Sequence, residues 1–249
     1  MTRLTAIASG KGGVGKTCLA IGLAQALAER GRRVALVDGD LGLANVDVQL
    51  GLDPKRDLGD LLAGACTAEE ALLPHPAGFA ILPGRSGAAG LAALDEAALG
   101  HAVRVLRSLP AEEVVLDLGA GIGRVQRRLA AAADRLLVVV TEEPTSLTDA
   151  YAVLKLHRQD AGAGQASVVV NLAANPAQAA RVHGALDAAC RNFLGRGVPM
   201  AGAVRRDAKV PAAIRAQVPL LTRHPACPAA EDLRAIAALL DAPPLRSIA

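Results

Sequence analysis

Residues 9–17, Ser9-Gly10-Lys11-Gly12-Gly13-Val14-Gly15-Lys16-Thr17, decide the fold of this chain. They match G-x-x-x-x-G-K-[ST], the pattern of a loop that binds phosphate groups. An apolar run at 4–8 predicts a strand before the loop, and leucines at every fourth position predict a helix over 17–28. The glycines let backbone N–H groups approach phosphate oxygens, and the helix N-terminus adds the positive end of its dipole. Strand, loop and helix in this order predict a nucleotide site.

The polar side chains of the loop have distinct predicted roles. Lys16 can bridge the β- and γ-phosphates of ATP, and the hydroxyl of Thr17 can ligate Mg²⁺. Lys11 is a second lysine inside the loop, although an ordinary loop of this type needs only Lys16. The residues that we assign to ATP binding in this segment are Gly12, Gly13, Val14, Gly15, Lys16, Thr17 and Cys18.

Apolar runs alternate with helical patterns along the rest of the chain. We predict strands at 4–8, 33–37, 79–82, 113–118, 135–140, 166–171 and 202–204. The predicted helices are 17–29, 95–108, 123–132, 146–159 and 177–194. Several strands are continuously apolar, which is typical of a parallel sheet covered by helices on both faces. The fold class is therefore α/β, with one domain over residues 1–249, and ligands are expected at the carboxyl ends of the strands.

Three aspartates lie at or just after the carboxyl ends of two of these strands. Asp38 and Asp40 come directly after the strand at 33–37, and Asp117 closes the apolar run Val114-Val115-Leu116. Carboxylates at these positions can hold Mg²⁺, a Mg²⁺-bound water or the attacking water of phosphoryl transfer. A turn or helix-capping role is the alternative for Asp38 and Asp40.

Together these motifs resemble the MinD/ParA family of deviant Walker A ATPases, a P-loop NTPase family. The match consists of K-G-G-x-G-K-T from Lys11, D-x-D-x-G-x-x-N from Asp38 and E-P-T-S-L-T-D-A-Y from Glu143. The last motif is most similar to the flagellar-placement branch (FlhG/FleN). The resemblance implies that Lys11 reaches the nucleotide of a second subunit in an ATP-bound homodimer. It also implies that Asp40 positions the hydrolytic water and that Asp38 and Asp117 lie near the metal. Glu143 either faces the partner's nucleotide, as in the family, or has a structural role.

Two further segments match the adenine site of the family with departures. Asn171 ends a predicted strand, where an amide can bond to the edge of the base. Leu172 follows it where the family usually has Arg. The segment Gly202-Ala203-Val204-Arg205-Arg206-Asp207 matches G-x-[ILV]-P-x-D, with Arg205 in place of Pro. Asp207 is the predicted base-site residue of this segment.

Composition restricts the partners and the compartment. The net charge of +3 comes from 27 basic and 24 acidic residues, which is too small a difference to predict a nucleic-acid partner. Four scattered cysteines without a C-x-x-C pair are typical of a cytoplasmic protein and do not predict an iron–sulfur cluster. No apolar run approaches the ~20 residues that span a bilayer.

The C-terminal region departs from the family in one respect. Family members commonly end in a basic amphipathic helix that binds membrane. Here the helical pattern at 230–241 has Arg234 as its only basic residue, so we expect this helix to pack on the sheet. Peripheral association with the inner face of the cell membrane stays an open alternative.

The sequence thus predicts an ATP- and Mg²⁺-dependent ATPase that dimerises with ATP and controls flagellar number or placement. Flagellar assembly or basal-body proteins are the partners that the resemblance implies. Division-site or DNA partitioning is the alternative within the family. An ATP-dependent ligase or metal-cluster carrier on the same fold, or a module that holds ATP without hydrolysing it, is the alternative outside it.

Overall fold

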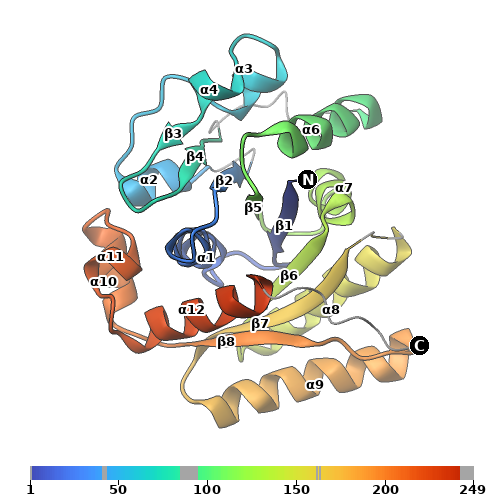
Figure 1. Ribbon diagram of the computed structural model, residues 1–249. Helices are drawn as coiled ribbons and strands as arrows, with labels where there is room; N and C mark the ends of the chain where they lie inside the picture. The colour runs from blue at the N-terminus through green and yellow to red at the C-terminus, as the bar shows by residue number, and fades with distance from the viewer. Residues whose placement is uncertain (1, 41–43, 85–94, 161, 163, 242–249) are drawn as a thin grey trace.

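An eight-stranded sheet forms the centre of the molecule, with helices on both faces (Figure 1). The computed structural model describes residues 2–40, 44–84, 95–160, 162 and 164–241. The strand order is β3-β4-β2-β5-β1-β6-β7-β8, and every neighbouring pair is parallel except β3 with β4. The strands are β1 Arg3–Ala8, β2 Val34–Gly39, β3 Leu73–Pro74, β4 Ala80–Leu82, β5 Glu113–Leu118, β6 Arg135–Val140, β7 Gln165–Ala173 and β8 Met200–Arg205.

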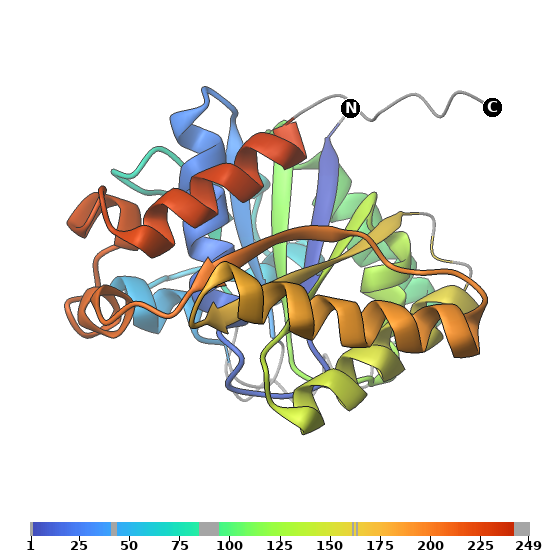
Figure 2. The same cartoon turned by 90° about the horizontal axis from the view of Figure 1, so that it is seen from below.

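The helices divide into two layers. One face of the sheet carries α1 and α12, and the other carries α6, α7, α8 and α9 (Figures 1 and 2). The longer helices are α1 Lys16–Glu29, α6 Glu96–Ser108, α7 Arg124–Ala132, α8 Pro144–Gln159, α9 Pro176–Leu194 and α12 Pro228–Asp241. The short helices are α2 Val46–Leu50, α3 Leu58–Leu62, α4 Ala68–Ala71, α10 Lys209–Arg215 and α11 Leu220–Arg223.

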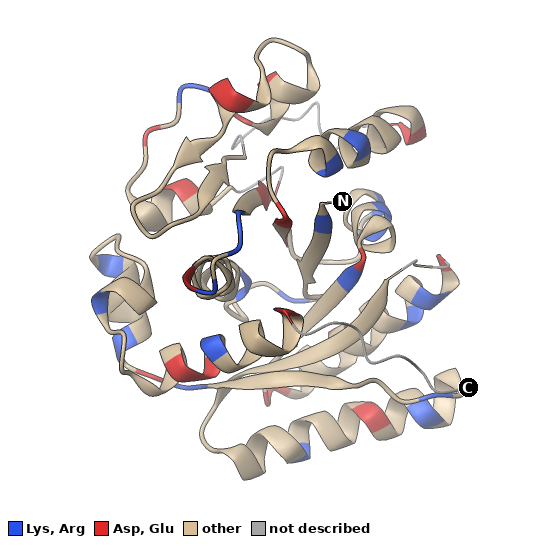
Figure 3. Cartoon of the chain, in the orientation of Figure 1, with Lys and Arg blue, Asp and Glu red and all other residues tan. Residues whose placement is uncertain are grey.

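The central strands are apolar because both of their faces are buried. Every residue of β2 and β5 is buried, as are the last five of β1 and β6. Alternate residues of each strand enter one of two hydrophobic cores, one against α1 and α12 and one against α6 to α9. Figure 3 shows acidic and basic residues interspersed over the helices, while the charged residues of the strands lie at or near the strand ends. The predicted α/β class is therefore confirmed.

The structure extends the predicted elements at the sheet edges. The strand predicted at 202–204 is β8 over Met200–Arg205, and most of its residues are only half-buried, which weakens the apolar pattern. The antiparallel strand β3 was not predicted, because its two residues are too few to show a period. The same reason applies to the short helices, which have four to seven residues each.

Helix α12 packs on the sheet, which confirms the prediction for 230–241. Leu233 and Ile236 are buried, and two glycines allow this close approach. A Cβ atom at Gly22 of α1 would lie 2.5 Å from Leu233, and one at Gly202 of β8 would lie 2.5 Å from Ile236. Residues 242–249 lie outside the described part of the chain.

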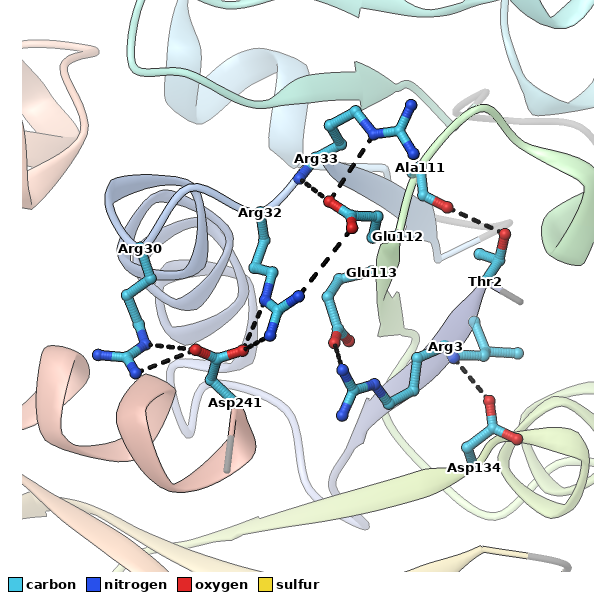
Figure 4. Close-up of polar contacts among 11 residues, drawn as sticks. Thr2, Arg3, Arg30, Arg32, Arg33, Ala111, Glu112, Glu113, Asp134 and Asp241 are labelled. Atoms are coloured by element: carbon cyan, nitrogen blue, oxygen red, sulfur yellow. Dashed lines mark hydrogen bonds and ion pairs between the residues drawn. The ribbon is translucent and has the colours of Figure 1, made fainter. Parts of the chain in front are cut away.

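A polar network lies at the end of the sheet where the parallel strands begin (Figure 4). Asp241, at the end of α12, accepts hydrogen bonds from Arg30 at 3.0 Å and from Arg32 at 2.6 Å. Arg3 forms an ion pair of 2.7 Å with the buried Glu113 at the start of β5. The contacts of Asp241 fix α12 to the connection between α1 and β2. The phosphate-binding loop lies at the opposite ends of the strands.

Candidate nucleotide-binding site

The glycine-rich loop connects β1 to α1 at the carboxyl edge of the sheet. Gly13 and Gly15 have φ values of 78° and 88°, a backbone region that favours glycine. The backbone N–H of Gly121, after β5, donates a hydrogen bond of 2.9 Å to the carbonyl of Ser9. Ser9 also donates its hydroxyl to the carbonyl of Lys11 at 2.6 Å. The loop is thus joined to the segment after β5.

Asn171 supports the loop from β7. Its side-chain Nδ2 donates a hydrogen bond of 2.7 Å to the backbone carbonyl of Val14, and the residue is buried. A side chain at Gly15 would collide with the same amide nitrogen. One N–H of this amide positions the loop. Its second N–H and its Oδ1 can still bond to an adenine edge, so that contact stays a prediction.

Lys16 lies at the start of α1 among carboxylates. It is only 9% exposed, and burial lowers the pKa of its ammonium group, while the nearby Asp117 and Asp40 oppose that shift. A buried cation beside a helix N-terminus is suited to phosphate oxygens, whose negative charge would replace the lost solvation.

Asp38 and Asp117 lie side by side on adjacent parallel strands. The register of β2 with β5 pairs the two residues directly, and both are buried. Burial raises the pKa of Asp117 to about 7, although a hydrogen bond from the Thr17 hydroxyl partly offsets this effect. Burial likewise raises the pKa of Asp38 to about 6. Each carboxylate would be more stable as an anion with a cation beside it.

Asp38 also organises the chain that follows it. Its two carboxylate oxygens accept hydrogen bonds from the backbone N–H groups of Asp40, Asn45 and Val46 at 3.0, 2.8 and 3.0 Å. The turn role that the sequence leaves open is therefore present at this position. Residues 41–43 of the D-x-D-x-G-x-x-N motif lie outside the described part of the chain. Asp40 lies against Gly119, where a Cβ atom would be 3.1 Å from its Oδ1.

The residues around Asp117 fit a magnesium ion. Within the described residues, its buried Oδ1 has no hydrogen-bond partner, which is unusual for a buried carboxylate oxygen. Its side chain shares a hydrogen bond with Thr17, whose hydroxyl is the ligand predicted from the loop motif. Carboxylate and hydroxyl oxygens are the hard donors that Mg²⁺ prefers, so Asp117 and Thr17 would hold the ion.

A cavity of about 560 Å³ adjoins the loop on the α1 side. Its walls include Gly13, Cys18, Asn171 and Asp207, so the structure brings the predicted phosphate and base residues to one site. The volume lies within the roughly 300–1,000 Å³ of small-molecule sites. Leu172, also in the wall, has a φ of 58°, which is uncommon for a residue other than glycine.

One of the two departures near the predicted base site, Arg205, has a structural explanation at the end of β8. Arg205, which replaces the family proline, donates its backbone N–H to Asp232 at 2.8 Å and pairs its guanidinium with the same carboxylate. A proline could not make the first of these bonds. Asp207 accepts hydrogen bonds from the backbone N–H groups of Lys209 and Ala229 at 2.8 and 3.3 Å. Asp207 therefore holds the starts of α10 and α12 at the cavity wall.

Lys11 points away from Lys16 toward the start of α8. Its ammonium group forms an ion pair with Glu143 and donates a hydrogen bond of 3.1 Å to the hydroxyl of Thr145. The side chains of Lys11 and Glu143 are 39% and 59% exposed, so the pair lies at the surface. Gly10 allows the loop to reach α8, because a Cβ there would lie 2.6 Å from Asp149.

Comparison with known proteins agrees with this geometry. A family model described as the CobQ/CobB/MinD/ParA nucleotide binding domain matches residues 5–220. The chain belongs to this family. The MinD/ParA resemblance of the sequence is therefore confirmed, and the P-loop geometry described above is that of a family member.

Two curated relatives and one solved structure illustrate the family. Antiactivator FleN of Pseudomonas aeruginosa is 37% identical over 245 residues, which cover 98% of this chain and 88% of FleN. The flagellum site-determining protein YlxH of Helicobacter pylori is 34% identical over 181 residues, covering 70% of this chain and 60% of YlxH. The septum site-determining protein MinD of Pyrococcus horikoshii, solved with Mg-ADP, has a TM-score of 0.81 and 26% identity, with 97% and 96% of the two chains covered.

The sequence did not predict several contacts of the phosphate-binding loop. Thr145 and Asp149, which meet the loop at Lys11 and Gly10, were expected only as parts of the E-P-T-S-L-T-D-A-Y motif. The side-chain contact of Asn171 with the loop was missed as well. All these contacts join segments more than 130 residues apart, and a short motif carries no signal for such pairs.

A metal-cluster carrier, one of the alternatives, would need a group of metal-ligating side chains. Across the described ranges, no set of three His, Cys, Asp or Glu side chains is placed to hold a metal ion, and the four cysteines are free thiols. None of the described helices has the length and apolar character needed to cross a membrane.

Proposed function

We propose that this protein is an ATPase whose ATP-bound form is a dimer, and that it controls the number or placement of flagella. The observation that carries the proposal is the arrangement around the loop. Lys16 and three aspartates converge on the carboxyl edge of the sheet, while Lys11 projects to the surface beside Glu143. One lysine thus serves its own site, and the other is available to a second subunit.

The chemistry assigned to the chain is phosphoryl transfer to water. Lys16 and the loop N–H groups bind the phosphates, and Asp40 holds a water in line with the γ-phosphate. Mg²⁺, when bound by Thr17 and Asp117, would neutralise charge on the phosphates. Asp38 keeps Asp40 in place by accepting a hydrogen bond from the backbone N–H of Asp40. No group at the site is a strong base, so we expect slow turnover that depends on positioning.

In the dimer, Lys11 would exchange its contacts within one subunit for a contact with the nucleotide of the other subunit. In the single subunit, Lys11 is paired with Glu143 and Thr145. Facing a second subunit, the same ammonium group would reach the partner's phosphates and stabilise charge there, as an arginine finger does. Loss of the γ-phosphate would remove that contact and release the dimer.

The flagellar role is supported by the relatives. FleN, described as an antiactivator, and YlxH, described as flagellum site-determining, are both at least 34% identical to the aligned part of this chain. We therefore propose flagellar assembly or regulatory proteins as partners. The protein would act in the cytoplasm, with peripheral association at the inner face of the cell membrane as the alternative.

The test is a strain of the source organism that lacks this chain, examined by electron microscopy. Flagella per cell and their positions are counted in the same images as minicells and anucleate cells. Altered flagellar number or position with normal division supports the proposal. Normal flagella contradict it, and minicells or anucleate cells would assign the protein to division or partitioning.

Two alleles, each introduced into the deletion strain, test whether ATP binding is needed for the flagellar role. Lys16→Ala should fail to restore flagella, whereas Lys55→Ala, a change of an exposed lysine outside the site, should restore them. Purified wild-type protein should hydrolyse ATP with a rate per subunit that rises with protein concentration. A rate independent of concentration would exclude the dimer requirement.

A further inference from the structure

The side chain of Gln126 folds back over the start of its own helix. Gln126 lies in the first turn of α7 and is half-buried. A Cβ atom at Gly123 would lie 2.6 Å from its Oε1, and one at Gly119 would lie 3.2 Å from its Nε2. The amide therefore lies over the segment 119–123, which follows β5 at the carboxyl end of the sheet.

Asp40 approaches the same glycine from the end of β2. Its Oδ1 would lie 3.1 Å from a Cβ atom at Gly119, the same point from which Nε2 of Gln126 is 3.2 Å away. The two side-chain atoms are therefore separated by no more than the sum of these distances. One water molecule with two ordinary hydrogen bonds joins atoms about 5 Å apart. This spacing allows a single water molecule to bond to both side chains.

The two side chains lie next to the groups that are expected to bind phosphate. The charge of Asp40 acts on both Lys16 and Asp117. The backbone N–H of Gly121 donates to the carbonyl of Ser9 at 2.9 Å, so the segment beneath the amide is fixed to the phosphate-binding loop. A water molecule held between the amide and the carboxylate would thus lie at the phosphate end of the nucleotide.

A capping role does not account for this side chain. Glutamine at the third position of a helix can accept a hydrogen bond from the backbone N–H of the residue before the helix. That residue is Gly123 in α7, and over the described ranges no hydrogen bond joins it to Gln126. The amide has no other hydrogen-bond partner among the described residues, so both its donor and its acceptor are available to a ligand.

We propose that the amide of Gln126 holds the attacking water together with Asp40. This inference rests on the proposed hydrolysis of ATP and adds a second group to its water site. Nε2 donates a hydrogen bond to the water oxygen, and the carboxylate of Asp40 accepts one from the water. With these two directions fixed, the remaining lone pair of the water can face the γ-phosphorus.

The amide neither takes nor gives a proton in this step. The bond between the water oxygen and the γ-phosphorus forms while the bond from that phosphorus to the leaving oxygen of ADP breaks. One proton of the water moves to another oxygen of the released phosphate. Gln126 contributes orientation alone, so we expect its loss to lower kcat and to leave the binding of ATP unchanged.

The experiment compares Gln126→Met with the wild type as full chains, since methionine has a similar length but no amide. ATP is saturating, and the protein concentration is high enough that the rate per subunit no longer rises. We expect kcat to fall about tenfold or more, while the dissociation constant of ATP stays within about twofold. Gln159→Met, the same change at an exposed glutamine of α8, should behave as the wild type.

A double variant separates a shared water from a structural effect. If Gln126 and Asp40 hold the same water, Gln126→Met should slow Asp40→Ala by less than about threefold, although it slows the wild type much more. A structural role would instead multiply the two losses and lower the thermal stability. Sedimentation velocity should also show that the Mg-ATP dimer of Gln126→Met outlasts that of the wild type, because its ATP is consumed more slowly.

Three results would overturn this inference and leave the proposed ATPase intact. They are a wild-type kcat in Gln126→Met, losses that multiply in the double variant, and a fall in ATP affinity as large as the fall in kcat. Absence of ATP hydrolysis by the wild type would overturn both proposals, so the two failures are distinguishable.

Discussion

Lys11 and Glu143 form an ion pair within one subunit, although 132 positions separate them in the chain. Thr145 accepts a second hydrogen bond from the same ammonium group at 3.1 Å. Exposed ion pairs contribute little free energy, because water screens them and both long side chains lose freedom. Lys11 can therefore leave Glu143 at small cost, as the proposed contact with a second subunit requires.

Lys11→Ala should remove the part of ATP hydrolysis that rises with protein concentration, while single subunits still bind ATP. Glu143→Gln should retain that part, because it removes only the competing contact of Lys11. We expect it to change the dissociation constant of the ATP-bound dimer by less than about fivefold. Glu142→Gln, next in the chain and also exposed, is the control. Unchanged concentration dependence in Lys11→Ala would remove Lys11 from the reaction.

Asp40→Ala should leave ATP binding intact and trap the dimer, because the water loses its positioning group while the phosphate contacts stay. Sedimentation velocity with Mg-ATP should show a stable dimer, and phosphate release should fall at least about a hundredfold. Asp53→Ala, an exposed carboxylate outside the site, should behave as the wild type. A monomer at the same ATP concentration would contradict the role of Asp40.

Lys16→Ala should abolish ATP binding. The lysine is buried at the start of α1, directly after the glycines of the loop, where its charge would meet the expected phosphates. Isothermal titration calorimetry should detect no binding at ATP concentrations that saturate the wild type and the Lys55→Ala control. Retained affinity within about tenfold of the wild type would mean that the backbone N–H groups suffice.

Asn171→Ala should loosen the phosphate-binding loop. The change leaves the carbonyl of Val14 without its hydrogen bond of 2.7 Å in a buried position. We expect the free energy of unfolding to fall by about 1–3 kcal/mol and ATP affinity to fall with it. Asn171→Asp should be worse, because an ionised carboxylate cannot donate to a carbonyl. Urea unfolding and ATP titration of both variants measure these effects, and wild-type values in both assays would refute the supporting role.

Arg205→Pro should destabilise the protein more than Arg205→Ala, although proline is the usual residue of the family. Alanine keeps the backbone N–H that donates to Asp232 at 2.8 Å, and proline does not. Thermal unfolding should rank wild type above alanine and alanine above proline. If proline were the more stable of the two variants, the fork between Arg205 and Asp232 would not explain this departure from the family.

The sequence by itself determined the phosphate-binding loop, the α/β class and the family, because each depends on local patterns. A loop that needs positive φ values must place glycines at fixed spacing, and strands buried on both faces must be continuously apolar. The same logic located Asp38 and Asp117 at strand ends, and the parallel register then placed them side by side.

Only the tertiary structure decided which side chains from distant parts of the sequence are in contact. Asn171 has a side chain that suits both a base edge and a carbonyl, and the approach of β7 to the loop brings one of its N–H groups to the carbonyl of Val14. Lys11 could extend into solvent, yet the packing of α8 against the loop at Gly10 brings Glu143 within its reach. Contacts between segments so far apart depend on the fold as a whole, so no local pattern can specify them.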